Sequence, residues 1–249
     1  MTARIEQPPI DTGSIVYVVD DDSELCEALS SLLRSVRLKT RIFGTANELL
    51  LLLTRLEDAP SCILLDIRLP GINGLDFHEN LVKAGVSLPV VFMTGHGDIP
   101  MAVRAMKAGA VDFLTKPLRD QDVLDAVMRA VECDRLRREA ATAEIALRDL
   151  YDDLSDRERQ VMTLVTKGLM NKQVAAELGL SEITVKVYRG QVMKKMSARS
   201  LVDLVCMSER LGLHRAAVRT APNIRMQRMY DGYAGRCDSY FSMKRTLPV

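Results

Sequence analysis

The chain has 249 residues, 47% of them apolar and 27% charged, which is typical of a folded globular protein and excludes a largely disordered one. No apolar run approaches the roughly 20 residues of a membrane span, and residues 1–14 do not have the pattern of a secretory signal, so we expect a cytoplasmic protein. Residues 1–154 carry 17 Lys/Arg and 25 Asp/Glu, residues 155–212 carry 10 and 6, and residues 213–249 carry 7 and 2. This asymmetry predicts that only the basic back of the chain binds a polyanion.

Short apolar runs alternate with longer amphipathic segments over residues 15–131, a pattern typical of a parallel sheet with helices on its faces. The predicted strands are residues 15–19, 40–43, 62–65, 90–93 and 111–114. The predicted helices are residues 23–35, 46–56, 74–84, 99–108 and 119–131. We therefore predict a five-stranded, parallel, doubly wound α/β domain over residues 15–131, after a flexible lead-in at residues 1–14.

Polar side chains follow the predicted strands at their carboxyl ends, where an open α/β sheet binds its ligands. Asp20 and Asp21 follow the first strand, Asp66 the third, Thr94 the fourth and Lys116 the fifth. Converging carboxylates require a hard cation, and oxygen ligands suit Mg²⁺. Mg²⁺ and a lysine together would stabilise a phosphoryl group during its transfer to a carboxylate. The alternative is that the aspartates only cap a helix or form a turn and that Lys116 is a surface residue.

The last helix of this domain continues past the sheet, because apolar residues recur at spacings of four and three. These residues are Leu136, Ala140, Ala143, Leu147 and Leu150. We predict a helical linker over residues 132–153 with a coiled-coil type of seam. The alternative is a single amphipathic helix that packs on its own domain.

A second domain is predicted to begin at residue 154, because Ser155 and Glu158 have the spacing of a capping box. Helices are predicted at residues 156–167, 171–178, 182–196 and 201–211, with Ser181 and Ser200 as N-caps of the last two. Residues 154–212 are thus predicted to form a small all-α four-helix domain. Residues 213–249 are basic and show no period, so we predict a disordered tail.

The second and third of these helices, joined by a short turn with Gly179, are typical of a helix-turn-helix that places its second helix in the major groove of double-stranded DNA. The predicted DNA-binding residues are Lys172, Thr184, Lys186, Val187, Tyr188, Arg189 and Lys194. The basic groups, with Lys195, would contact phosphates, and Lys186 and Val187 would reach base edges. The residues expected to face partly inward are Ile183, Val187, Val192 and Met196.

Four runs in the first domain resemble the motifs of two-component response-regulator receivers: VVDDD at 18–22, LDIRLPGING at 65–74, MTGHGD at 93–98 and KP at 116–117. The resemblance covers about residues 15–130. It implies that Asp66 is the phosphoacceptor, that Asp20, Asp21, Asp66 and the backbone carbonyl of Arg68 hold Mg²⁺, and that Thr94 and Lys116 contact the phosphoryl group. It also implies that Phe113 is a switch aromatic and that the Lys116–Pro117 bond is often cis.

Neither His78 nor His96 has the helical setting of a phosphohistidine donor, and both are expected to be surface residues. The donor is therefore expected to be another protein, a sensor histidine kinase.

Three runs of the second domain are similar to the LuxR-type output domain of the NarL/FixJ family: LSDRERQV at 154–161, NKQVA at 171–175 and TVKVYR at 184–189. The MKAGA run at 106–110 favours the FixJ branch. Gly190 stands where some relatives carry a DNA-reading lysine, so we expect no base contact there. The resemblance implies a transcription activator that is phosphorylated on Asp66, forms a homodimer, binds promoter DNA and recruits RNA polymerase.

Other functions with the same acidic site have different requirements. A stand-alone enzyme of the aspartyl-phosphatase type would not need the basic helical domain, and a phosphate-shuttle protein would lack it, so we expect no enzyme. An ATPase-type regulator would need a G-x-x-x-x-G-K-[ST] loop, which the sequence does not contain. Two modes of control are compatible with the sequence: the unphosphorylated receiver covers the DNA-binding helices, or it leaves the chain monomeric.

Overall fold

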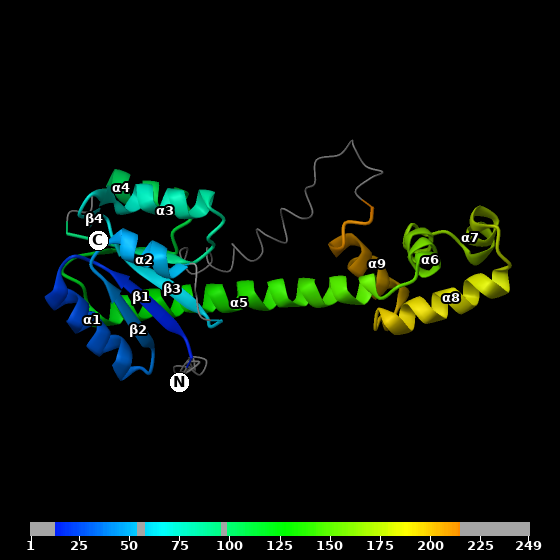
Figure 1. Cartoon of the computed structure of the whole chain (residues 1–249), viewed down its shortest axis with the longest axis horizontal. Helices are drawn as coiled ribbons and strands as arrows, with labels where there is room; N and C mark the ends of the chain where they lie inside the picture. The colour runs from blue at the N-terminus through cyan, green and yellow to red at the C-terminus, as the bar shows by residue number, and fades with distance from the viewer. Residues whose placement is uncertain (1–12, 54–57, 96–98, 215–249) are drawn as a thin grey trace, which may run out of the picture. The chain divides into compact units, whose positions relative to one another are not determined.

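The computed structural model describes residues 13–53, 58–95 and 99–214 (Figure 1). It divides into two compact units, Met1–Ala143 and Glu144–Val249, and each is described by itself. Residues 1–12 of the predicted lead-in, residues 54–57 at the end of the second predicted helix, His96, and residues 215–249 of the predicted tail lie outside the described residues.

The first unit is built on a five-stranded parallel sheet with the order β2-β1-β3-β6-β7, which confirms the predicted fold class. The strands are β1 (Ile15–Val19), β2 (Lys39–Phe43), β3 (Ser61–Asp66), β6 (Val90–Thr94) and β7 (Asp112–Thr115). Two short strands, β4 (Arg68–Leu69) and β5 (Ile72–Asn73), pair in an antiparallel hairpin that the sequence pattern did not predict. The chain leaves β1 toward β2 and returns to β3 on the other side, so ligands are expected at the carboxyl ends of β1 and β3.

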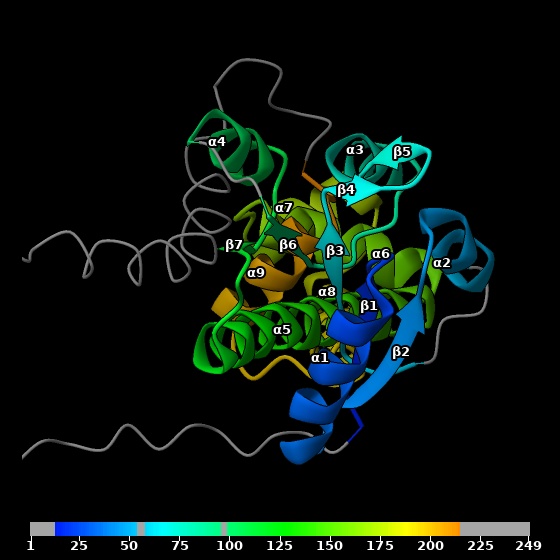
Figure 2. The same ribbon diagram turned by 90° about the vertical axis from the view of Figure 1, so that its left-hand side faces the viewer.

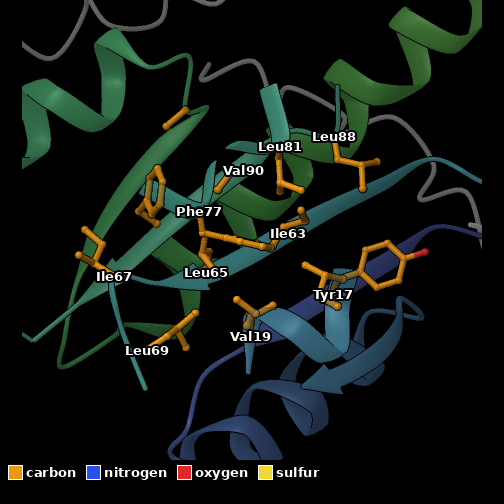
Figure 3. Close-up of a cluster of buried hydrophobic side chains, with 14 of the residues drawn as sticks. Tyr17, Val19, Ile63, Leu65, Ile67, Leu69, Phe77, Leu81, Leu88 and Val90 are labelled. Atoms are coloured by element: carbon orange, nitrogen blue, oxygen red, sulfur yellow. The ribbon is translucent and has the colours of Figure 1, made fainter. Parts of the chain in front are cut away.

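Helices cover both faces of this sheet (Figure 2). They are α1 (Ser23–Ser35), α2 (Ala46–Leu53), α3 (Gly74–Lys83), α4 (Ile99–Lys107) and the first part of α5 (Asp120–Asp152). Every residue of β1 is buried, and successive side chains point to opposite faces. Tyr17 and Val19 pack in the cluster beneath α2, α3 and α4 (Figure 3), whereas Val16 and Val18 pack beneath α1 and α5. The continuous apolar runs in the sequence are therefore strands buried on both faces.

Helix α5 is held to the sheet beyond the predicted end of the receiver at residue 131. The carboxylate of Asp134 is fully buried and accepts a hydrogen bond from the backbone N–H of Ser61, where β3 begins (2.9 Å). Arg137 and Arg138 pair with the same carboxylate at 2.6 and 2.7 Å, and Arg138 also reaches Asp58 (2.9 Å). No local sequence pattern predicts this attachment of α5, because the hydrogen bond joins residues 73 positions apart.

The far end of α5 belongs to the core of the second unit. Leu147 is buried there, and Leu150 and Tyr151 pack against the same cluster, whereas Ala140 and Ala143 are exposed. The apolar residues at the C-terminal end of the predicted linker thus pack in the core of the second unit. The linker boundaries of 132–153 remain a prediction. No helix among the described residues, α5 included, is both long and apolar enough to cross a membrane.

The second unit adds α6 (Asp156–Thr166), α7 (Asn171–Leu178), α8 (Glu182–Lys195) and α9 (Leu201–Arg210), so the all-α prediction is confirmed. Ser155 accepts from the backbone N–H of Glu158, whose side chain accepts in return from the N–H of Ser155. The side chains of Ser181 and Ser200 cap α8 and α9 as predicted. Each serine satisfies an amide that the first helical turn leaves without a partner.

His78 is buried, only 4% exposed, so its prediction as a surface residue is wrong. It lies on the sheet-facing side of α3, between Leu75 and Leu81, and packs edge-on against the ring of Phe92 at 5.5 Å. Its Nδ1 finds no hydrogen-bond partner among the described residues. Burial lowers the pKa of His78 below its usual 6.5, and the nearby charge of Glu79 offsets this only in part.

We expect the receiver to lose stability as the pH falls below about 6.5. In that range His78 binds a proton in the unfolded chain but stays neutral in the folded chain, because its pKa is lowered there. One such proton gives a slope of at most about 1.4 kcal/mol per pH unit. The free energy of unfolding in urea can be measured for the whole chain from about pH 7.5 to about pH 5, a range that spans the usual histidine pKa. It should depend less steeply on pH for His78→Gln than for the unmodified chain. His214→Gln, in the second unit, is the matched control, and an equal pH dependence for all three proteins would contradict the prediction.

Candidate functional sites

Three carboxylates meet at the carboxyl ends of β1 and β3, two strands that are adjacent in the sheet. One oxygen each of Asp20, Asp21 and Asp66 lies within 4.8 Å of the others. Asp20 and Asp66 are buried and Asp21 is exposed. An open cleft of about 530 Å³ is lined by Asp21 and by residues 67–73, which include the β4–β5 hairpin. Asp21 thus lies at the border between this cleft and the two buried carboxylates.

Lys116, just after β7, joins the two buried carboxylates. Its Nζ donates to Oδ2 of Asp20 (2.7 Å) and to Oδ2 of Asp66 (3.0 Å). The Lys116–Pro117 peptide bond is cis, as the resemblance implied. The other oxygens are held by the backbone: Oδ1 of Asp20 accepts from the N–H of Asp22 (3.0 Å), and Oδ1 of Asp66 from the N–H of Arg68 (3.2 Å).

Burial and ion pairing shift the pKa values of two groups of this site, Asp20 and Lys116. Burial raises the pKa of Asp20 above its usual value, and the hydrogen bond from Lys116 lowers it by less. Burial also lowers the pKa of Lys116, but its hydrogen bonds to Asp20 and Asp66 and the charges of these carboxylates together outweigh this, so the pKa lies above its usual value. The lysine is therefore charged at neutral pH, and a further cation beside Asp20 would stabilise the carboxylate form. An all-oxygen set with three carboxylates fits a divalent cation such as Mg²⁺.

The remaining predicted residues of the first site lie on neighbouring strands. Thr94 ends β6, fully buried, and β6 pairs with β3 so that Met93 lies opposite Asp66. Phe113 lies on β7 and packs, half-buried, against the cluster beneath α2, α3 and α4. Arg68 is exposed at the start of the β4–β5 hairpin.

Gly74 is a residue of this site that the sequence analysis missed. It is the first residue of α3, and a Cβ built on it would lie 2.3 Å from the backbone oxygen of Asp66. Its N–H donates to the carbonyl of Ile67 (2.8 Å). The start of α3 is thus packed directly against the backbone of Asp66, and the signal in the sequence was a glycine in the first turn of a helix, which is otherwise unfavourable.

The predicted DNA-binding residues occupy α7, the turn and α8. Gly179 ends α7 in the left-handed conformation (φ 66°), which glycine adopts without strain. The exposed positions are Lys172, Lys186, Val187 and Lys194. The half-buried positions are Thr184, Tyr188 and Arg189. Tyr188 packs against the core beneath α8, and Arg189 donates to the side chain of Asn171 (3.2 Å), so these two residues also hold α8 in place.

Two predictions for the orientation of α8 are wrong. Ile183 and Val187 were expected to face partly inward, but they are 78% and 54% exposed. Each is two positions from Val185, which is about 200° around a helix, and Val185 is buried in the core. Val192 and Met196 are buried as predicted. Lys195, expected to contact phosphates, has a side chain that is 38% exposed and donates to Oε2 of Glu158 at 2.8 Å.

Comparison with known proteins supports a two-domain regulator. Residues 16–128 match the response regulator receiver domain, and residues 152–208 match the luxR family of bacterial regulatory proteins. Fold and site together therefore define a two-component response regulator with a DNA-binding output domain. The chain belongs to the FixJ-type response regulators with a LuxR-type helix-turn-helix.

Relatives along most of the chain support this membership. Nodulation protein W of Bradyrhizobium diazoefficiens is 57% identical over 81% of this chain and 88% of its own. The transcriptional regulatory protein FixJ of Azorhizobium caulinodans is 43% identical over 78% of this chain and 90% of its own. The solved structure of the response regulator StyR is 43% identical, covers 80% of this chain and 99% of its own, and superposes with a TM-score of 0.70.

Proposed function

We propose that a sensor histidine kinase phosphorylates this regulator on Asp66, and that the phosphorylated chain forms a homodimer, binds promoter DNA and activates transcription through RNA polymerase. The observation that carries the proposal is the ammonium group of Lys116, which bridges Asp20 and the buried carboxylate of Asp66 at 2.7 and 3.0 Å. A carboxylate beside a fixed cation, with two further aspartates that suit a metal, is equipped to accept a phosphoryl group.

The chemistry follows from the positions of these groups. A carboxylate oxygen of Asp66 attacks the phosphorus atom of a phosphohistidine, the P–N bond breaks, and the imidazole leaves. Mg²⁺ bound by Asp20, Asp21, Asp66 and the carbonyl of Arg68 would neutralise charge on the phosphoryl oxygens. Lys116 supplies the second positive charge, and the hydroxyl of Thr94 donates a hydrogen bond to a phosphoryl oxygen. The chain in this proposal accepts a phosphoryl group and is not an enzyme acting on an external substrate.

The proposed output is a shift between two populations of the receiver. Thr94 turns toward the phosphoryl group, Phe113 moves into the vacated space, and the surface around α4 changes. The packing of α4 supports this step: of its described residues only Ala105 is buried, and apolar Ile99 and Val103 are exposed. A dimer formed through this surface would place two helix-turn-helix units on adjacent DNA half-sites.

The test is to treat the full-length chain with acetyl phosphate in the presence of Mg²⁺. We expect the mass of one phosphoryl group to be added, the solution mass to double, and affinity for promoter fragments selected from genomic DNA to rise. Chelation of Mg²⁺ before the treatment is the control and should prevent all three changes. Equal DNA affinity and equal solution mass with and without the phosphoryl group would contradict the proposed regulation by phosphorylation.

A further inference from the structure

The exposed face of α8 carries an apolar stripe. Ile183, 78% exposed, and Val187, 54% exposed, are one helical turn apart on this face, and Gly190 follows less than one turn later. A Cβ built on Gly190 would meet no atom of the described part of the chain within 4 Å. Lys186 is exposed to one side of the stripe, and Lys194 is exposed about two turns beyond Val187, in line with it. The middle of the face is therefore apolar and low, with positive charge at one side and at its C-terminal end.

The core of the second unit does not use this stripe. The buried side of α8 is formed by Val185, Val192 and the adjoining Met196, which already fill the clusters shared with α6 and α9. Ile183 stands in the first turn after the cap at Ser181, where a polar side chain would serve the helix equally well. Two large apolar side chains left in water are thus available for a partner.

The position of this face in the domain indicates that its partner is DNA. Helix α8 is the second helix of the helix-turn-helix, and such a helix enters the major groove of DNA. Aliphatic side chains form no hydrogen bonds to base edges, and the apolar group that the major groove presents is the C5-methyl of thymine. The positive charges of these two lysines suit a DNA surface that is rich in phosphates. The bare backbone at Gly190 permits the helix to approach the base edges closely.

We infer that Ile183, together with Val187, is a specificity-determining residue that recognises thymine C5-methyl groups in the bound site. This inference rests on the proposed DNA-binding function and deepens it, because it assigns the sequence preference to apolar contacts by the first turns of α8. Phosphate contacts, such as one by Lys194, would then supply affinity without choosing a sequence, and the base contact predicted for Lys186 would act beside the apolar ones.

The test begins with selection of a preferred site from a pool of random duplexes by the full-length chain treated with acetyl phosphate and Mg²⁺. Each thymine of that site is then replaced singly by deoxyuridine, which keeps the base pair and removes only the methyl group. For the unmodified chain we expect one or two positions to lose affinity by about fourfold, the value of one buried methyl group. For Ile183→Ala we expect this thymine preference to disappear at one of those positions.

Two further variants make the result specific. Leu51→Ala removes an apolar side chain that is also 78% exposed, but on α2 of the receiver, and should keep every thymine preference. Val187→Ala should remove the preference at a neighbouring position. A thymine preference that survives unchanged in Ile183→Ala and Val187→Ala, or its absence in the unmodified chain, overturns the inference. Failure to select any duplex would refute the DNA-binding function itself.

Discussion

Replacement of Asp66 by asparagine is expected to abolish phosphorylation of the chain and, with it, any gain in dimerisation and DNA binding. The amide has nearly the same size and shape as the carboxylate, so the receiver should still fold. It provides no anionic oxygen to attack phosphorus, and Lys116 loses one of its two ion pairs while keeping Asp20. Labelling with acetyl phosphate or with a kinase-bound phosphoryl group, followed by mass spectrometry of the intact chain, measures the effect.

The matched control for this experiment is Asp125→Asn, because Asp125 is an exposed aspartate on α5 whose carboxylate accepts a hydrogen bond from Gln121 and is not one of the three clustered carboxylates. This variant should be labelled at the rate of the unmodified chain. Undiminished labelling of Asp66→Asn would show that another residue accepts the phosphoryl group. It would leave the fold and the family membership untouched, since neither depends on the role of Asp66.

Gly74→Ala is expected to destabilise the receiver by about 1–3 kcal/mol, the usual cost of forcing a methyl group into a filled site. The added Cβ would lie 2.3 Å from the backbone oxygen of Asp66 and 3.0 Å from the Cα of Ile67. Both atoms are backbone atoms at the end of a buried strand, so neither can move aside as a flexible side chain would. Relief of the clash must shift α3 or Asp66 itself, and we therefore expect slower labelling with acetyl phosphate as well.

Urea unfolding and labelling rates, measured on the same full-length variant, check both parts of this prediction. Gly44→Ala is the control, because a Cβ at Gly44 would meet no described atom within 4 Å. Its stability and labelling should stay close to those of the unmodified chain. Equal stability of the two glycine variants would mean that the contact between α3 and Asp66 relaxes freely.

Much of the architecture was predictable because its signals are local. Strands that are buried on both faces must be apolar without interruption, so β1 and β3 were evident in the sequence. Helix starts were evident at Ser155, Ser181 and Ser200, because capping depends on residues within one turn. The positions of Asp20 and Asp66 at strand ends followed from the same pattern, and the strand order brought the two residues together.

Other features depend on contacts between distant residues, and no local pattern could predict them. The burial of His78 depends on the ring of Phe92, which lies on another element. The clash at Gly74 exists only because α3 begins against the backbone of Asp66. The two-residue strands β4 and β5 are too short to show a period. The exposure of Ile183 depends on the choice of Val185 and Val192 as the buried side of α8, since apolar residues occur on more than one side of that helix.

The sequence by itself determined the two domains of this regulator, the acidic residues at the strand ends and the helix-turn-helix, because periodicity, caps and strand-end motifs are properties of neighbouring residues. Only the tertiary structure decided which side of a helix faces the core and which atoms come within a few ångströms of each other. For that reason Lys116 could be named from the sequence, but its bridge between Asp20 and Asp66 could not. The outward stripe of α8 likewise became evident only when the packing beneath it was known.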